Sequence, residues 1–147
     1  GPHGIGTVQL FMEPKEDSHF FTLRESHPRE CQRIAVFDCL VNNADRKASH
    51  CFQDKGGKVW SVDHGLTFHT DYKVRTVIWD WAGEPIPQEL VNDLRSLSSR
   101  FGELQKSLTP YLTGMELQVL RKRLDRLIES STFPRPRYGR NTPWPLF

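Results

Sequence analysis

The sequence lacks a strong excess of charge of either sign, because 20 lysine and arginine residues stand against 18 aspartate and glutamate residues. The formal net charge of +2 argues against a protein whose main role is broad, non-specific binding to nucleic acid. Long hydrophobic runs are also missing, so we expect neither a transmembrane segment nor a secretory signal peptide. A composition that is 37% hydrophobic and 26% charged is typical of a globular, cytoplasmic protein.

Cysteine is scarce, and its spacing excludes two kinds of cross-link. The three cysteines are Cys31, Cys39 and Cys51, an odd number without a C-x-x-C pair. This pattern argues against a disulfide framework and against a structural zinc site. We therefore expect reduced cysteines that pack in or near the core of the protein.

The hydrophobic pattern predicts three short elements before residue 65: a strand at Thr7–Met12, a helix from about Ser26 to Asn42, and a hairpin with strands at Cys51–Gln53 and Lys58–Val62. The strand rests on β-branched and aromatic residues, the helix on Pro28 in its first turn and on an apolar face, and the hairpin on a glycine pair. Asn43 is the predicted helix stop, because asparagine tolerates a left-handed backbone. Residues 74–81 are compatible with a short helix or an ordered loop.

The last third of the chain predicts helices with a regular apolar face. Apolar residues recur at steps of three and four between positions 87 and 108, which predicts one helix. The segment Thr113–Glu116 has the spacing of a capping box and predicts the start of a second helix. We expect the proline-rich tail at 133–147 to lie extended over the body, with Trp144 as its anchor.

Two acidic segments carry the residues that indicate chemistry. Asp45 follows the predicted helix, and His50 comes five positions later; after the predicted hairpin, Asp63 precedes a histidine and a glycine. Phosphoryl transfer needs one carboxylate to orient the attacking hydroxyl and further ligands to hold magnesium against the phosphates. Lys47 is placed to reach the transferring phosphate as a point charge. The same residues are also compatible with a solvated turn that has its own ion pairs.

Four segments carry a resemblance to a known family: Val41-Asn-Asn-Ala-Asp-Arg-Lys47, Asp63-His-Gly65, Lys73–Trp79 and Ala82–Pro87. With them, nearly the whole chain resembles the small phosphatidylinositol 3-/4-kinase-like proteins of actinobacteria, which are distantly related to the HipA toxin kinases and to eukaryotic lipid kinases. The resemblance implies an α+β, mostly helical fold, namely the C-terminal lobe of a kinase-like protein with a small β-hairpin that carries the active-site loop. Within this single lobe it implies a hinge-like strand at 1–14, catalytic and metal-binding loops at 26–87, a helical pair at 88–130 and an extended tail at 131–147.

The resemblance also implies roles for individual residues. Asp45 would be the catalytic aspartate, and Lys47 would neutralise charge in the transition state. Asp63 would bind magnesium, with His50 and Asn43 completing the metal site. The backbone of the hinge-like strand would contact the adenine of ATP through Val8, Gln9, Leu10, Phe11 and Met12.

The sequence departs from the kinase pattern at three points. His50 stands where the kinase loops have asparagine, and Lys47 stands where lipid kinases have histidine. Since imidazole suits manganese better than magnesium, Mn2+ is an alternative to Mg2+ as the cofactor. Neither a glycine-rich phosphate loop nor a strand lysine precedes Val8, so we expect an N-terminal lobe that is deleted, cleaved away or supplied as a separate polypeptide.

We therefore predict an ATP-dependent phosphotransferase whose acceptor is a hydroxyl group on a protein, a lipid head group or a small molecule. Two alternatives are a pseudokinase or nucleotide-binding interaction module, and a structural or regulatory helical domain without nucleotide. A zinc site at His50, Cys51, His64 and His69 is a weaker alternative, because their spacing matches no recognised zinc pattern. A Ser-His-Asp hydrolase lacks a nucleophile elbow, and nucleic-acid binding rests only on arginine-rich segments.

Overall fold

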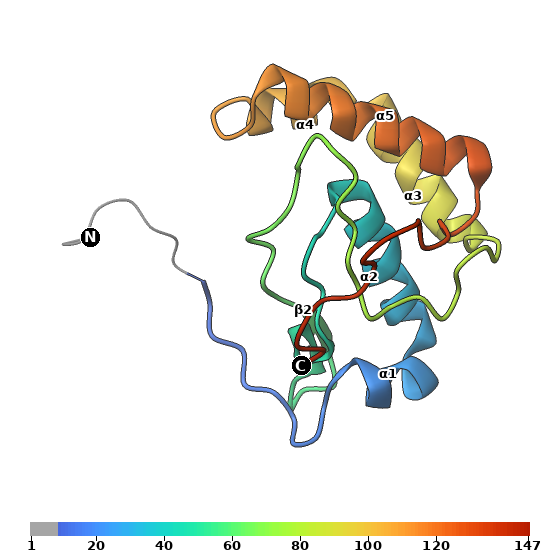
Figure 1. The fold of residues 1–147 in the computed structure, drawn as a ribbon. Helices are drawn as coiled ribbons and strands as arrows, with labels where there is room; N and C mark the ends of the chain where they lie inside the picture. Colours follow the sequence, from blue (N-terminus) through green and yellow to red (C-terminus); the bar gives the residue numbers. More distant parts are fainter. Residues whose placement is uncertain (1–8) are drawn as a thin grey trace.

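The computed structural model describes residues 9–147, a range with five α-helices and one small antiparallel sheet (Figure 1). The helices are α1 (Phe20–Ser26), α2 (Pro28–Val41), α3 (Gln88–Ser99), α4 (Phe101–Leu108) and α5 (Gly114–Ser130). A 3₁₀ turn, η1 (Ala48–His50), leads into β1 (Cys51–Gln53), which pairs with β2 (Val59–Ser61). The mostly helical content with one small sheet agrees with the fold that the resemblance implies, and the hairpin confirms the prediction made from the pattern.

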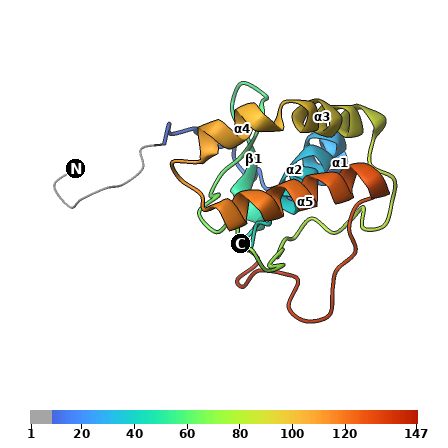
Figure 2. The ribbon, with the colours of Figure 1, turned by 90° about the horizontal axis from the view of Figure 1, so that it is seen from above.

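Helix α2 connects the two ends of the molecule (Figure 1). It contacts α1, which also contacts η1 and β1, and it contacts α5, which packs against α3 and α4. Seen from above, α3 and α5 run alongside each other over α2 (Figure 2). The core between these elements includes Phe20, Leu90 and Leu124, and it contains Cys31 and Cys51 as the sequence predicted.

Helix α5 confirms the predicted capping box. The Thr113 hydroxyl accepts a hydrogen bond from the Glu116 amide at 3.3 Å, and the Glu116 carboxylate accepts one from the Thr113 amide at 2.7 Å. These bonds satisfy backbone groups that the first turn of a helix leaves unpaired. The helix then buries leucines at steps of three and four: Leu117, Leu120, Leu124 and Leu127.

The prediction of one continuous helix at 87–108 is wrong, because the chain breaks between α3 and α4 at Arg100. The backbone of Arg100 has φ −105° and ψ 16°, and its amide donates to the carbonyls of Ser96 and Leu97. Serine and glycine are weak helix formers, and Ser98, Ser99 and Gly102 surround the break. The apolar spacing did not reveal it, because both helices face the same core.

The predicted strand at Thr7–Met12 is wrong for residues 9–12, which have no strand structure, and Val8 with the rest of it lies outside the described residues. A β-branched and aromatic sequence forms a strand only where a neighbour pairs with it. The chain reaches the hairpin later, where Pro14 forms an isolated bridge with Asp54. The Lys15 amide then donates to the Gln53 carbonyl at 2.7 Å.

Two further segments have structures that the apolar spacing does not determine. Helix α1, which the pattern did not predict, spans seven residues and buries Phe20 and Leu23. Residues 74–81 form an ordered loop rather than a helix, and Thr76 makes a parallel bridge with Arg46 in that loop. Short elements of this kind are held by tertiary contacts and not by their own propensity.

The C-terminal tail lies along the body as expected, but Trp144 is not its anchor, because 78% of its surface is exposed. The tail is held instead by the Asn141 carbonyl, which accepts hydrogen bonds from the Thr76 amide and the Trp79 indole, both at 3.0 Å. The Leu146 carbonyl accepts a further bond from the Ala48 amide at 2.8 Å. In Figure 1 this brings the C-terminus beside the hairpin.

Within residues 9–147, each helix is too short or too polar to cross a membrane.

Candidate functional site

The candidate site begins where α2 ends, at Asn42 rather than at the predicted Asn43. Asn42 takes the left-handed conformation, with φ 61°, and is fully buried. Its side-chain amide donates to the carbonyls of His69 and Asp71, both at 2.7 Å, and its side-chain oxygen accepts from the Lys73 amide at 2.8 Å. Asn42 therefore ends the helix and holds the loop at 69–73 against it.

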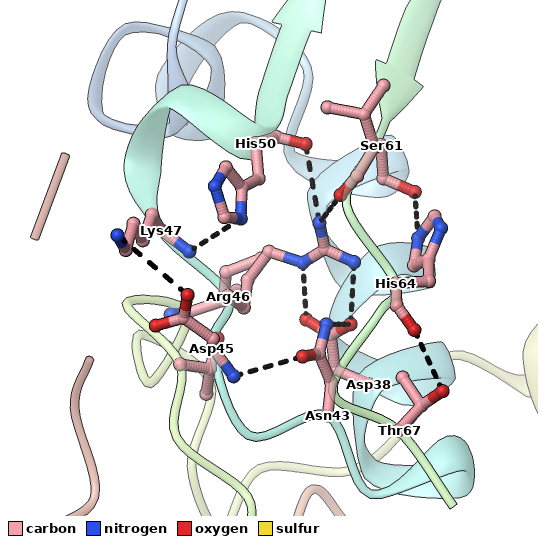
Figure 3. A network of polar contacts seen from close by, with 12 residues as sticks. Asp38, Asn43, Asp45, Arg46, Lys47, His50, Ser61, His64 and Thr67 are labelled. Atoms are coloured by element: carbon pink, nitrogen blue, oxygen red, sulfur yellow. Dashed lines mark hydrogen bonds and ion pairs between the residues drawn. The ribbon is translucent and has the colours of Figure 1, made fainter. Parts of the chain in front are cut away.

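Asp38 in α2 and Arg46 in the loop that follows α2 form a fully buried ion pair (Figure 3). Arg46 donates from Nε to Asp38 Oδ2 and from Nη2 to Asp38 Oδ1, both at 2.8 Å. Its Nη1 donates to the Val62 carbonyl at 2.7 Å and to the His50 carbonyl at 3.3 Å. Arg46 thus joins α2, the start of β1 and the segment that leads into Asp63.

The surroundings of Arg46 keep it charged. Burial by itself favours the neutral form, but the hydrogen bonds and the charge of Asp38 raise the pKa of Arg46 above its ordinary value. A bidentate pair of this kind fixes both partners in orientation as well as in charge. The pair is a positioning device, since both side chains have no exposed surface.

Asn43 continues the network toward Asp45. Its side-chain amide donates to Asp38 Oδ1 at 3.0 Å, and its Oδ1 accepts from the Asp45 amide at 3.0 Å. Both polar ends of this buried side chain are occupied, so Asn43 orients the backbone of Asp45. The geometry favours this role over the predicted metal ligand.

Asp45 and Lys47 lie at the accessible side of this network. Lys47 Nζ is 3.8 Å from Asp45 Oδ2, and the two side chains are 21% and 30% exposed. A partly exposed ion pair of this length holds its members weakly. Asp45 is therefore a carboxylate on a rigid backbone that an incoming hydroxyl group can reach.

His50 connects the loop to Asp63. The Lys47 amide donates to His50 Nδ1 at 3.4 Å, and His50 Nε2 lies 3.5 Å from Asp63 Oδ2. Burial lowers the pKa of His50 below 6.5, which favours the neutral ring. The two ring nitrogens therefore face the Lys47 backbone and the Asp63 carboxylate, and these contacts set the orientation of the ring.

Asp63 presents its carboxylate to solvent. Its backbone is left-handed, with φ 56°, and its side chain is 60% exposed. The next residue, His64, turns back toward the body, where its ring stands edge-on to Phe37 at a centroid distance of 5.3 Å. Burial lowers the pKa of His64 below 6.5. The Asp-His-Gly turn therefore anchors its histidine and leaves its aspartate free for a ligand.

The predicted zinc alternative is wrong. Among the described residues, which include His50, Cys51, His64 and His69, no three His, Cys, Asp or Glu side chains are grouped to hold a metal ion. Burial also raises the pKa of the Cys51 thiol to about 12, whereas a zinc ligand must be a thiolate. A magnesium site is less demanding, because Mg2+ uses one or two carboxylates together with water and substrate phosphates.

The structure brings together four of the residues that the sequence singled out, namely Asp45, Lys47, His50 and Asp63, through contacts from Lys47 to Asp45 and His50 and from His50 to Asp63. Figure 3 shows the first three of them. The predicted adenine contacts at 9–12 lie on a separate irregular segment, where Leu10 and Phe11 are 78% and 82% exposed. Roles for Asp38, Asn42 and Arg46 were not predicted from the sequence. One signal was available in the sequence: Asp38 is a charged residue on the core side of the predicted helix, and a buried charge needs a partner.

A known protein family matches the part of the chain that contains these residues. The family described as phosphatidylinositol 3- and 4-kinase matches residues 2–117 of the chain. The matched range contains the whole polar network from Asp38 to Asn42, Arg46 and Asp63, and it ends within α5.

Two curated relatives match over much of this chain. Protein Rv2133c of Mycobacterium tuberculosis is 40% identical over 117 residues, which are 79% of this chain and 42% of that protein. Phosphatidylinositol 4-kinase gamma 4 of Oryza sativa subsp. japonica is 27% identical over 106 residues, which are 67% of this chain and 19% of that protein. The chain thus spans less than half the length of these relatives. No solved structure matches the chain.

Proposed function

The chain belongs to the phosphatidylinositol 3- and 4-kinase family, and on this premise we propose that it carries a phosphotransfer site for ATP. The observation that carries the proposal is the position of Arg46. One buried guanidinium fixes the loop that bears Asp45 and, through the Val62 carbonyl, the segment that bears Asp63. Two carboxylates with a fixed relation are what phosphoryl transfer requires.

In this proposal Asp45 orients the acceptor hydroxyl and takes up its proton. Asn43 fixes the backbone of Asp45. The Asp45 side chain forms only a weak ion pair with Lys47, which an incoming hydroxyl group can replace. A general base needs this combination of fixed position and access. The acceptor class is a hydroxyl group of a protein, a lipid head group or a small molecule.

Asp63 would hold the metal ion. Its exposed carboxylate fits Mg2+ or Mn2+ together with the phosphates of ATP. When bound, the ion supplies charge neutralisation for the β- and γ-phosphates. His50 would donate from Nε2 to the Asp63 carboxylate or to a phosphate oxygen, and so hold that group in place. Lys47 would place a positive charge beside the transferred phosphoryl group.

The predicted contact of residues 9–12 with adenine belongs to the same proposal. Leu10 and Phe11 expose apolar side chains that a nucleotide base can cover. We expect Leu10→Ser and Phe11→Ser to weaken binding of ATP more than binding of triphosphate alone. Equal binding of ATP by the variants and the unchanged protein would remove this segment from the site.

The proposal is tested by the production of ADP from ATP in the presence of Mg2+ or Mn2+, with a serine-containing protein, phosphatidylinositol and glycerol supplied in turn as the hydroxyl acceptor. Asp45→Asn should lower the rate about a hundredfold or more, because it removes the proton acceptor. Asp93→Asn on α3 is the matched control, since it removes one exposed carboxylate far along the chain from both loops. ADP production that is absent from the unchanged protein, or equal in Asp45→Asn, would overturn the phosphotransfer proposal.

A second candidate function is nucleotide binding without transfer, as in a pseudokinase. The observation that favours it is the commitment of Asn43 and His50 to bonds within the protein, which leaves Asp63 with fewer candidate metal ligands than the sequence implied. Binding of metal and ATP with no ADP production would support this function over the first.

A further inference from the structure

A second site candidate lies away from the phosphotransfer loops, between α5, the loop at 70–83 and the start of the C-terminal tail. A cavity of about 610 Å³ opens there. Four arginines line it: Arg123, Arg126, Arg135 and Arg137. We call it the arginine pocket. Asp45, Lys47, His50 and Asp63 do not line it, so a ligand of the arginine pocket would be independent of the proposed function.

The charge of the arginine pocket is strongly one-sided. Glu129 is the only acid among its lining residues, and within residues 9–147 none of the four arginines forms an ion pair. Arg123 is held by carbonyl groups instead, through Nε to Leu40 at 2.8 Å and through Nη1 to His69 at 3.2 Å. A protein with a formal net charge of only +2 concentrates positive charge here without neutralising it.

Two buried donors of the lining lack a partner. Arg123 Nη2 and the Tyr72 hydroxyl are both buried and have no hydrogen-bond partner among the described residues. Unsatisfied buried donors are rare and costly, and a bound acceptor is one of their explanations. Burial lowers the pKa of Arg123 and raises that of Tyr72, because both groups lose contact with water in this pocket.

Two of the other arginines, although exposed to solvent, pack against neighbouring residues. The guanidinium of Arg137 stacks on the Tyr72 ring at 3.9 Å from its centroid. Arg135 lies so close to Gly83, which has φ +84°, that a side chain at position 83 would collide with its guanidinium. Such packing fixes the donors before a ligand arrives, which lowers the entropy lost on binding.

Another part of the lining is apolar and is formed by Val119, Leu127, Phe133 and Pro134. A purely ionic ligand would leave this surface uncovered. A planar guanidinium group can donate two hydrogen bonds to two oxygens of one phosphate group. The apolar wall favours an organic group on the same molecule.

We propose that the arginine pocket binds an organic phosphate, with the phosphate group among the arginines and its organic group against Leu127 and Phe133. The ligand supplies acceptor oxygens to donors that the protein leaves unpaired. The same chemistry is offered by a free organophosphate and by the phosphate head group of a lipid.

The test is calorimetric titration of the full chain with phenyl phosphate, with dioctanoyl phosphatidate as a monomer, and with inorganic phosphate. We expect saturable binding to one site, with both organic phosphates binding more tightly than inorganic phosphate. The double variant R126Q/R135Q should weaken binding about tenfold or more, because it removes two charged donors to phosphate. These exposed side chains make no ion pair, so the variant should remain folded.

The control is K106Q/K122Q, which removes the same charge from exposed positions outside the pocket. It should change the dissociation constant less than twofold. Vesicles of phosphatidylcholine with and without phosphatidate then distinguish the sources: sedimentation that depends on phosphatidate and on the two arginines assigns a lipid head group, and its absence assigns a free organophosphate. No saturable binding of either organic phosphate, or equal weakening in the two double variants, would overturn the proposal.

Discussion

At the scale of single residues, the buried Arg46 guanidinium is shared among groups from three segments. It binds Asp38 in α2, the His50 carbonyl at the entrance to β1, and the Val62 carbonyl just before Asp63. Without Arg46, the buried Asp38 carboxylate would lose its charged partner and the two carbonyl groups would lose the donor that they share. The positions of the two candidate catalytic loops are therefore set by one side chain that itself has no exposed surface.

Removal of this side chain should be strongly destabilising. Arg46→Met leaves the buried Asp38 carboxylate without its charged partner, with only the Asn43 amide still donating to it. We expect a loss of about 3–5 kcal/mol in the free energy of unfolding, measured by urea denaturation. The double variant Asp38→Leu with Arg46→Met should lose less than the single variant, because it removes both charges. An unchanged unfolding midpoint for Arg46→Met would show that the pair does not support the loops.

Tyr72 provides an opposite case. Its hydroxyl is buried without a partner, while its ring supports Arg137. Tyr72→Phe keeps the ring and removes the unpaired group, so the melting temperature should stay the same or rise in protein without ligand. A fall of several degrees would mean that the hydroxyl already has a stabilising partner.

Asp45, Lys47, His50 and Asp63, which the sequence singled out, are joined by contacts in the structure, because a helix, a loop and a hairpin bring them together by local chain geometry. Their roles in phosphotransfer stay predictions. The sequence did not identify Arg46 as buried. The segment Asp45-Arg46-Lys47 is equally compatible with a solvated turn, and its burial depends on Asp38 and on carbonyl groups as distant as Val62.

At the scale of elements, the regular helices were predictable and the irregular segments were not. The capping box at Thr113 and the leucine spacing defined α5 correctly, because both signals are local. The break at Arg100 and the irregular course of residues 9–12 depend on neighbours that the sequence does not show. Helix α1 was also not predicted, because it depends on its contacts with α2, η1 and β1.

The capping box makes the stability of α5 dependent on pH. Hydrogen bonds from the Thr113 amide and hydroxyl lower the pKa of Glu116 below 4.5, so the charged form stabilises the fold. This contribution is fully present above pH 4.5 and is lost as the pH falls through the lowered pKa. Glu116→Gln should reduce the melting temperature at pH 7. In acid, the melting temperature of the variant should approach that of the unchanged protein.

The control for this effect is Glu103→Gln, which removes an acid from the first turn of α4 without removing a capping box. It should lower the melting temperature less than Glu116→Gln at pH 7. A Glu116→Gln difference that is as large at pH 3 as at pH 7 would assign the effect to something other than the charge.

The tail should depend on Phe133 and not on Trp144. Phe133 is 4% exposed and packs beside Trp81 at a centroid distance of 6.3 Å, whereas Trp144 is 78% exposed. We expect Phe133→Ala to cost about 3–5 kcal/mol and Trp144→Ala to stay within about 0.5 kcal/mol by urea denaturation. The reverse order would restore Trp144 as the anchor.

At the scale of the whole molecule, the fold places two ligand-binding candidates in one helical body. The proposed phosphotransfer site lies between the end of α2 and the hairpin, and the arginine pocket lies between α5 and the tail. The resemblance carried by the motifs anticipated the mostly helical architecture. The second site could not be predicted, because its arginines come from α5 and from the tail and meet only in three dimensions.

The proposed phosphotransfer site requires that Asp63 and its loop hold a metal ion together with ATP. This requirement is tested most directly by calorimetric titration of the full chain with ATP in the presence of Mn2+ or Mg2+, for the unchanged protein and for Asp63→Asn. Asparagine tolerates the left-handed backbone at this exposed position, so the variant should stay folded. We predict metal-dependent binding that Asp63→Asn weakens at least tenfold and Asp93→Asn leaves unchanged; equal binding by all three proteins would contradict a metal and nucleotide site at Asp63.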